Sequence, residues 1–366
     1  MANRHSIDAD AFSEFTLSVF QAIGIPNDQA IDAVNALVWA SLRGVDTHGI
    51  RNLKSYYVDT VAEQRIKANP EFRIEHESAM SARVDGDGGI GLIAACWGMR
   101  LAIEKAKQSG IGFVSIRNSN HLGAAGFYSH MAVEHDMIGL SMSGHLYADG
   151  NDSGMPPVFS MQPMFGTNPL SVAVPCGDEP AYVLDMSTSI VPVNRVELLK
   201  AAGQLIPRGW CLDADGMPTT DPEAAKIYLP LGGTRELGAH KGYGLAMFVE
   251  VLTAVLSNGW SQQPNDDEKD EQPRFAQNKI ANCFGAMRID LFRDPKEFRS
   301  GMDAMIHSLH RARPAAGHDR IYVPGEIEFE TEQERRRNGI PLADTTVQEL
   351  RELSAQYGVP LNLSSG

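Results

Sequence analysis

The chain has 366 residues, of which 43% are hydrophobic and 21% are charged, and its net charge at pH 7 is -14. This composition suits a globular protein with a large core, and the acidic balance argues against nucleic acid or an anionic membrane as a partner. The four cysteines are far apart, and no apolar segment suits a signal peptide or a membrane span. We therefore expect a reduced, cytoplasmic protein.

The chain begins with two predicted amphipathic helices. Residues 6–24 and 27–43 place apolar side chains at helical spacing, and a glycine follows each pattern. The next segment, R-G-V-D-T-H-G-I-R-N-L-K-S-Y-Y, is dense in reactive side chains. His48 could transfer a proton near neutral pH, and Arg51 could bind a carboxylate. A solvated loop that opens a helix is an equally good interpretation.

A glycine-rich segment follows, in which residues 84–91 read V-D-G-D-G-G-I-G and spell GxGxxG before a predicted helix. A Rossmann site needs a strong strand before this motif and an acid about twenty residues after it to bind the ribose. The preceding A-M-S-A-R-V is a poor strand, and Arg117 follows the next apolar segment where an acid is needed. We therefore predict a packed turn and not a Rossmann site.

His121 lies between a predicted strand, 111–116, and a helix that starts at Phe127. The intervening N-S-N-H-L-G-A-A-G has small residues that leave room for a ligand. Catalytic residues often occupy such loops, although a structural histidine is the plain alternative. A further strand, 137–142, precedes a long loop, 143–165, that contains His145. Loops of this length are often functional.

Two further segments could bind an anion. A short strand, 181–185, ends in D-M-S-T-S, which could hold a phosphate or ribose or simply cap a helix. In G-A-H-K-G-Y-G, His240 and Lys241 precede a helix that starts near Tyr243, so this turn could bind a phosphate or merely pack tightly. That helix is apolar nearly all round, with Glu250 its lone charge, which predicts full burial.

The remaining segments have mostly structural interpretations. We predict irregular structure over 190–236, a solvated acidic loop over 265–272, a strand over 280–289, and a strand into a turn over 321–326. His307 and His310 are too few for a metal site and are interpreted as structural. The last forty residues are predicted to be helical.

Several of these motifs occur together and in order, and on them the chain resembles the malate/L-lactate dehydrogenase family, which includes type-2 malate and ureidoglycolate dehydrogenases. The motifs are R-G-V-D-T-H-G-I-R, the glycine turn at 86–91, R-N-S-N-H-L-G-A-A-G, G-T-N-P, L-D-M-S-T-S, H-K-G-Y-G and V-P-G-E. The resemblance implies a homodimeric oxidoreductase that transfers a hydride between NAD, or alternatively NADP, and a 2-hydroxy or 2-oxo acid such as malate, lactate, ureidoglycolate or sulfolactate. It also implies an α/β, mixed-sheet, non-Rossmann fold.

The resemblance further implies three regions and a set of site residues. The regions are an N-terminal helical part with the catalytic histidine loop (1–80), a cofactor-binding mixed-sheet region (81–300), and a C-terminal segment that packs back on the N-terminal part (301–366). The implied catalytic residues are His121, His48, Arg51 and Thr47. The implied cofactor-binding residues are His145, Asp185, Met186, Ser187, His240, Lys241, Gly325 and Glu326.

The chain also departs from the family pattern. A Gly-Lys pair that is common after D-M-S-T-S is Asn194-Arg195 here, and the loop 145–160 contains an additional D-G-N-D-S-G. Two alternatives stay open. The same histidines and arginine could serve a reductase of cyclic imine acids. A metal-dependent hydrolase or lyase could instead use His48, His121, His145 and Asp185 as ligands.

Overall fold

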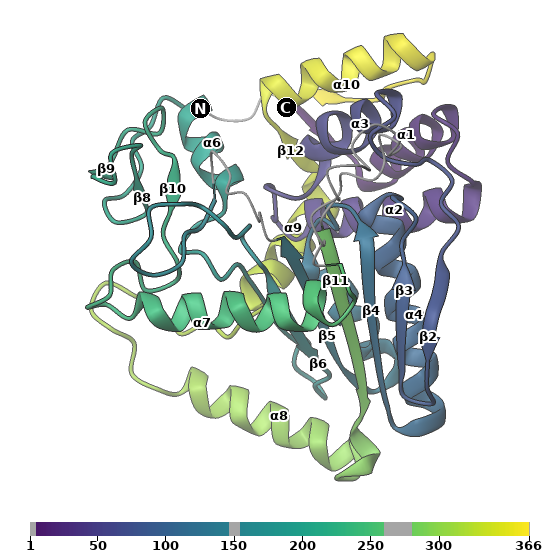
Figure 1. The fold of residues 1–366 in the computed structure, drawn as a ribbon, viewed down its shortest axis with the longest axis vertical. Helices are drawn as coiled ribbons and strands as arrows, with labels where there is room; N and C mark the ends of the chain where they lie inside the picture. Colours follow the sequence, from purple (N-terminus) through teal and green to yellow (C-terminus); the bar gives the residue numbers. More distant parts are fainter. Residues whose placement is uncertain (1–4, 146–153, 260–279, 366) are drawn as a thin grey trace, which may run out of the picture.

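The centre of the molecule is a seven-stranded mixed sheet in the order β2-β3-β4-β11-β5-β6-β7 (Figure 1). The computed structural model describes residues 5–145, 154–259 and 280–365. The strands are β2 (Arg73–Glu77), β3 (Ser81–Asp85), β4 (Ile111–Ser119), β11 (Ile280–Arg288), β5 (Met137–His145), β6 (Leu170–Val174) and β7 (Tyr182–Met186). Only β3 and β4 pair in parallel, so the described sheet is predominantly antiparallel.

Helices cover both faces of this sheet. On one face lie α4 (Gly91–Ser109) and α5 (Ala125–Met131), and on the other lie α7 (Ala239–Glu250) and the π-helical turn η4 (Val251–Val255). Side chains alternate between the faces of a strand. In β11, Phe284 therefore joins the main core with α4, while Cys283 packs with Val249 of α7. This two-sided packing explains why β11 is buried on both faces from Ala281 to Ala286.

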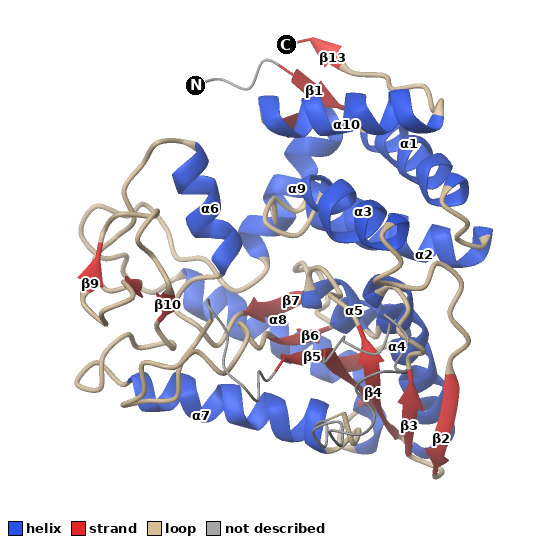
Figure 2. Cartoon of the chain, turned by 45° about the horizontal axis from the view of Figure 1, so that its top comes forward, coloured by secondary structure: helices blue, strands red, loops and turns tan. Residues whose placement is uncertain are grey.

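The N-terminal and C-terminal segments pack against each other above the sheet (Figure 2). They contain β1 (His5–Ile7), α1 (Ala9–Ala22), α2 (Asn27–Leu42), α3 (Asp59–Ala62), α9 (Glu326–Asn338), β12 (Ile340–Leu342), α10 (Asp344–Tyr357) and β13 (Ser364–Ser365). β1 pairs with β12 and β13, while α9 lies on α2 and α10 on α1. The chain also forms the short turns η1 (Ile50–Asn52), η2 (Leu53–Val58), η3 (Val133–His135) and η7 (Ile289–Leu291) and the helix α8 (Pro295–His310).

Residues 188–235 form a small lobe beside the sheet (Figure 1). The lobe contains α6 (Val193–Ala201), β8 (Cys211–Leu212), β9 (Pro218–Thr219) and β10 (Ile227–Tyr228). Val191, Val196, Ile206, Cys211 and Tyr228 form its own apolar core. The prediction of mostly irregular structure missed α6. This helix is short, and Val196 is its one buried residue, so its apolar pattern is weak.

One segment judged a poor strand is a strand, one predicted strand is absent, and one predicted loop lies outside the described residues. Ser81–Asp85 is a strand despite its weak pattern, because β2 and β4 flank it. Residues 321–326 do not form a strand, since Gly325 at φ 93° turns the chain into α9. The acidic loop predicted at 265–272 is outside the described residues.

Helix α7 is not fully buried, contrary to the prediction. Glu250, the acid at its C-terminal end, is only 4% exposed, whereas Met247 and Phe248 are 45% and 48% exposed. The apolar surface continues through Val251 and Val255 of η4. The sequence shows that both sides of this helix are apolar, but it cannot show that only one side meets the sheet. No helix in the described residues is long and apolar enough to span a membrane.

Candidate active site

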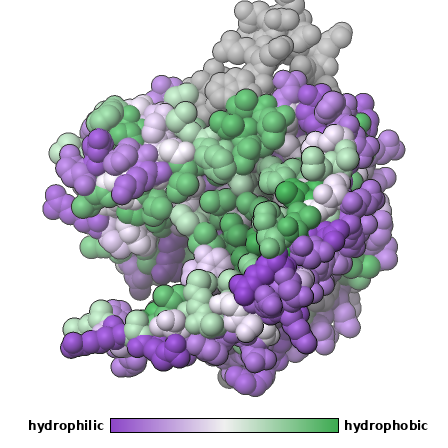
Figure 3. Space-filling view, turned by 90° about the horizontal axis from the view of Figure 1, so that it is seen from below, coloured by the Kyte–Doolittle hydropathy of each residue, from purple (hydrophilic) through white to green (hydrophobic). Residues whose placement is uncertain are grey.

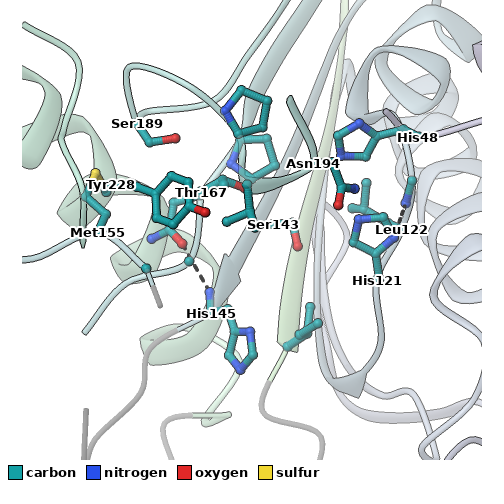
Figure 4. A pocket seen from close by; sticks show the side chains of 18 of the residues that line it. His48, His121, Leu122, Ser143, His145, Met155, Thr167, Ser189, Asn194 and Tyr228 are labelled. Atoms are coloured by element: carbon teal, nitrogen blue, oxygen red, sulfur yellow. Dashed lines mark hydrogen bonds between the residues drawn. The ribbon is translucent and has the colours of Figure 1, made fainter. Parts of the chain in front are cut away.

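Two hollows meet where the sheet, the N-terminal segment and the small lobe come together. The histidine chamber, with a volume of about 260 Å³, is lined by residues that include His48, Tyr56, His121, Ser143, His145, Thr167, Asn168, Asn194 and Tyr228 (Figure 4). The long cleft, with a volume of about 870 Å³, runs past the end of β7. The two hollows share His48, Gly123, Thr167, Pro169, Ser189 and Pro192, so they lie side by side.

His121 lies in the loop between β4 and α5, as the sequence predicted. Its Nδ1 accepts a hydrogen bond from the Gly123 N–H at 3.3 Å and lies 3.1 Å from the Tyr57 hydroxyl. Because the backbone N–H can only donate, Nδ1 must carry the lone pair in the neutral ring. The proton of neutral His121 is therefore on Nε2.

His48 lies in the turn after α2, and its ring stacks on that of His121 with 5.3 Å between centroids and 16° between planes. Its Nδ1 is 2.7 Å from Oγ1 of Thr47. Unlike a backbone N–H, this hydroxyl can donate or accept a hydrogen bond. His48 can therefore hold its proton on either nitrogen without losing this partner.

Both histidines are held in the neutral form at pH 7. Burial, together with the nearby charge of Arg51, lowers the pKa of His48 to about 4. Burial, together with the neighbouring His48, lowers the pKa of His121 to about 3. An anionic ligand in the chamber would raise the pKa of both histidines, because a negative charge nearby favours the protonated ring.

Arg51 lies at the edge of the chamber and does not line it. Its Nη1 donates to the backbone oxygen of Asn194 at 3.3 Å. The side chain of Asn194 in turn accepts from the Tyr56 hydroxyl at 3.2 Å and donates to the backbone oxygen of Thr47 at 2.9 Å. The guanidinium has further N–H groups that could form a fork with a carboxylate.

The long cleft contains Asp185, Met186, Ser187 and Gly325, four of the residues predicted to bind a cofactor. Asp185 accepts from the Gly126 N–H at 2.7 Å. Protein atoms packed around the cleft raise the pKa of the Asp185 carboxyl to about 6, although water in the cleft still reaches this side chain. A Cβ on Gly325 would lie 2.9 Å from the backbone nitrogen of Val183, so a glycine is needed at this wall.

His145 ends β5 and lines the chamber, and its backbone N–H donates to Asn168 Oδ1 at 3.3 Å. The amide nitrogen of Asn168 donates in turn to the buried Glu250 at 2.8 Å. Burial raises the pKa of Glu250 to about 7. The part of the predicted long loop at 146–153 lies outside the described residues.

Three predicted cofactor residues lie apart from this space. Within the described part of the chain, His240 and Lys241 are exposed at the start of α7 and line neither hollow. Glu326 accepts from the Val323 N–H at 3.0 Å and lies 3.0 Å from His310 Nε2, which makes it a structural contact here. The described residues contain no group of three or more metal-ligating side chains placed to hold a metal ion.

Sequence reasoning missed the contacts made by Tyr57, Asn168 and Glu250. Tyr57 follows Tyr56 in a dense functional segment, and Asn168 belongs to the G-T-N-P turn, so both motifs gave a signal. The lone charge of an apolar helix was the signal for Glu250. Its partner could not be identified because the two residues are far apart in the sequence.

Comparison with known proteins decides the family. The family described as malate/L-lactate dehydrogenase matches residues 7–351. The chain belongs to the malate/L-lactate dehydrogenase family. The malate dehydrogenase of Pyrococcus abyssi is 36% identical over 96% of this chain and 95% of that protein. The L-sulfolactate dehydrogenase of Methanocaldococcus jannaschii is 32% identical over 94% of both proteins.

Solved structures agree with this assignment. The crystal structure of malate dehydrogenase from Entamoeba histolytica has a TM-score of 0.88 and 34% identity, covering 97% of this chain and 99% of that chain. The delta1-piperideine-2-carboxylate reductase from Pseudomonas syringae has a TM-score of 0.79 and 25% identity, covering 95% and 99%. This malate/L-lactate dehydrogenase family member is therefore an oxidoreductase with the predicted mixed-sheet α/β fold, acting on hydroxy or oxo acids with a nicotinamide cofactor.

The GxGxxG of this dehydrogenase family member is a packing turn. A Cβ on Gly91 would lie 2.1 Å from the backbone oxygen of Asn120, and one on Gly86 would lie 2.9 Å from that of Asn118. These glycines let the turn pack against the loop that carries His121. The turn therefore has a packing role, and none of residues 86–91 lines either of the two hollows.

Proposed function

We propose that this chain interconverts a small 2-hydroxy acid and its 2-oxo acid with NAD(H), and that malate and oxaloacetate are the first pair to test. The observation that carries the proposal is the stacked His48–His121 pair in a chamber that adjoins the long cleft and shares His48 with it. The substrate occupies the chamber and the cofactor lies in the cleft. When bound, the cofactor supplies or accepts the hydride.

The two histidines have different roles. If Nδ1 of His121 were protonated, its N–H would face the N–H of Gly123, and two donors cannot form a hydrogen bond. This ring therefore stays neutral and donates its Nε2–H to the substrate oxygen. His48 transfers the proton, because Thr47 Oγ1 can accept from Nδ1–H once the ring is protonated. In the oxidation direction, neutral His48 takes the hydroxyl proton. In the reduction direction, protonated His48 returns it.

Replacing each histidine with asparagine tests this division. His48→Asn should lower kcat on the order of 100-fold or more and remove the ionisation from the pH profile of kcat/KM. His121→Asn should lower kcat but keep that ionisation. If His121→Asn alone removed the ionisation, the two roles would be reversed. Turnover of no 2-oxo acid by the wild-type protein would refute the proposed substrate class.

Arg51 binds the substrate carboxylate at the edge of the chamber. One N–H of the guanidinium is held by the backbone of Asn194, which leaves others for a carboxylate. Arg51→Gln should raise KM for oxo acids about 100-fold with a smaller effect on kcat, as loss of ground-state binding requires. An unchanged KM would exclude this role.

Charge in the long cleft favours NAD over NADP. Within the described part of the chain, Asp185 and Glu328 line the cleft and form no ion pair, whereas Arg195 is the one cation there without such a pair. A ribose hydroxyl can donate to a carboxylate, while a 2′-phosphate would be repelled by one. Titrations of NADH and NADPH, followed by nicotinamide fluorescence, should give a lower Kd for NADH than for NADPH. The change Glu328→Gln should bring the two Kd values closer together.

Reduction of a cyclic imine acid is the second candidate, because the structure is similar to that of the Pseudomonas syringae reductase. An imine acid also has a carboxylate beside the reacting carbon, so Arg51 and the histidines could serve it. A panel of oxaloacetate, pyruvate, sulfopyruvate and Δ1-piperideine-2-carboxylate, followed by nicotinamide absorbance, separates the two. Turnover of the cyclic imine alone would favour this candidate.

The exposed apolar face of α7 and η4 supports a homodimer. Phe248, Val251, Val255 and Leu256 are 48%, 50%, 52% and 55% exposed. Apolar side chains also gather on the face seen from below in Figure 3. Light scattering after size-exclusion chromatography should give twice the chain mass, and the double change Val251→Lys with Val255→Lys should shift the measured mass toward that of one chain.

The free thiols of Cys96, Cys176, Cys211 and Cys283 are consistent with the reducing cytoplasm.

A further inference from the structure

Asn194 connects the small lobe to the segment that carries the proposed proton-transfer and carboxylate-binding groups. It is the second residue of α6, and the helix is held in place by Val196 in the core of the lobe. Its three polar groups contact Thr47, Arg51 and Tyr56, which all come from the N-terminal segment. Figure 4 shows the Asn194 side chain beside both histidines.

Each contact controls a different part of the site. The Asn194 amide donates to the oxygen of Thr47, the residue whose hydroxyl meets His48 Nδ1. The Asn194 side-chain oxygen accepts from the hydroxyl of Tyr56, whose ring lies 4.8 Å from that of His121. Its backbone oxygen holds the guanidinium of Arg51. A residue without a side chain could make only the last of these contacts.

Asn194 and Arg195 line different hollows. Asn194 lines the histidine chamber, and Arg195 lines the long cleft. The start of α6 therefore reaches both the proposed substrate site and the proposed cofactor site. A change at Asn194 should alter the chamber and leave cofactor binding nearly unchanged.

We propose that Asn194 is a positioning residue, which uses the docked small lobe to hold Thr47–His48, Arg51 and Tyr56 in their working arrangement. This inference rests on the proposed function, since it assigns Asn194 a part in aligning the same groups. Misplacing reacting groups by about 1 Å can reduce turnover on the order of 100-fold. Asn194 acts through its neighbours, so its loss should leave a slower enzyme that still binds NADH.

The first experiment compares Asn194→Ala with Glu197→Ala, an exposed change on the same helix. Asn194→Ala should lower kcat/KM for the best oxo acid about 10- to 100-fold and change the Kd for NADH less than about twofold. Glu197→Ala should change neither. Combining Asn194→Ala with Tyr56→Phe should cost less than the sum of the single changes, because the two residues share a contact. Equal losses in Asn194→Ala and Glu197→Ala would overturn the proposal.

A second readout does not depend on the substrate. Histidine ring NMR of the substrate-free enzyme follows the titration of His48 in the wild type, Asn194→Ala and Asn194→Asp. Asn194→Asp keeps the acceptor for Tyr56 but adds a negative charge, so the pKa of His48 should rise by about one unit. If the wild type turned over no oxo acid while Asn194→Ala shifted the His48 titration, the proposed function would fail and the role of Asn194 would stand. Unchanged kcat/KM in Asn194→Ala together with an unchanged His48 titration in both variants would overturn the inference.

Discussion

The lowered pKa values of His48 and His121 predict that acid destabilises the folded protein. An unfolded histidine titrates near 6.5, whereas the folded rings titrate near 4 and 3. Between pH 7 and pH 5 the unfolded chain therefore binds more protons than the folded chain, and the free energy of unfolding falls as the pH falls. Each histidine should contribute about 2 kcal/mol to this loss. The amount hardly depends on the exact folded values, because both lie well below pH 5.

The perturbation that isolates one contribution is His121→Asn, whose Oδ1 can still accept from the Gly123 N–H. Buried Glu250 and the cleft residue Asp185 have raised pKa values and oppose the histidines, because a raised carboxyl pKa adds stability as the pH falls. These contributions are present in both proteins and cancel in the difference. The wild type should thus lose about 2 kcal/mol more than His121→Asn between pH 7 and pH 5.

Urea unfolding followed by tryptophan fluorescence at pH 7, 6 and 5 measures this difference, at one protein concentration because oligomerisation affects apparent stability. The exposed residue His318, changed to asparagine, controls for the loss of an imidazole as such. An equal pH dependence in the wild type and His121→Asn would refute the reasoning. It would show that water already solvates the ring in the folded state.

Three further substitutions have defined outcomes. Gly91→Ala places a Cβ 2.1 Å from the oxygen of Asn120 and should lower the free energy of unfolding in urea by about 2–3 kcal/mol; an unchanged value would mean that the turn shifts freely. Asp85→Asn weakens the ion pair with Arg117, which is 2.9 Å long, and should cost about 1–3 kcal/mol in the same assay, more at low salt than at high salt. Asp185→Asn should raise the Kd for NADH about tenfold in fluorescence titration, and a wild-type Kd would remove Asp185 from the cofactor site.

Local motifs predicted the parts of the site that depend on strand ends. His121 and Asp185 were found because a short apolar segment followed by small polar residues indicates a strand that ends in a functional loop. Their placement in one site, which the structure divides between two adjoining hollows, came only from the family resemblance. The contacts of Asn194 to Arg51 and Tyr56 could not be predicted, since they join residues more than a hundred positions apart.

Apolar patterning also has a physical limit, which α7 illustrates. Periodicity reports which side chains avoid water, but not which surface covers them. Met247 is exposed and Glu250 is buried, which is the reverse of what their polarity suggests. The buried side of the helix provides Asn168 as a hydrogen-bond partner for the Glu250 carboxyl. The weak pattern of Ser81–Asp85 was misleading for a related reason, since its neighbours in the sheet and not its own residues make it a strand.

The position of β11 in the sheet affects how the chain folds while it is being synthesised. This strand, Ile280–Arg288, lies between β4 and β5, which leave the ribosome well over a hundred residues earlier. Until β11 arrives, two apolar strands that flank the active site have open edges, and such edges pair readily with other chains. We therefore expect slow folding, because the sheet depends on non-local pairing. Chains truncated before residue 280 should aggregate and lack the histidine chamber.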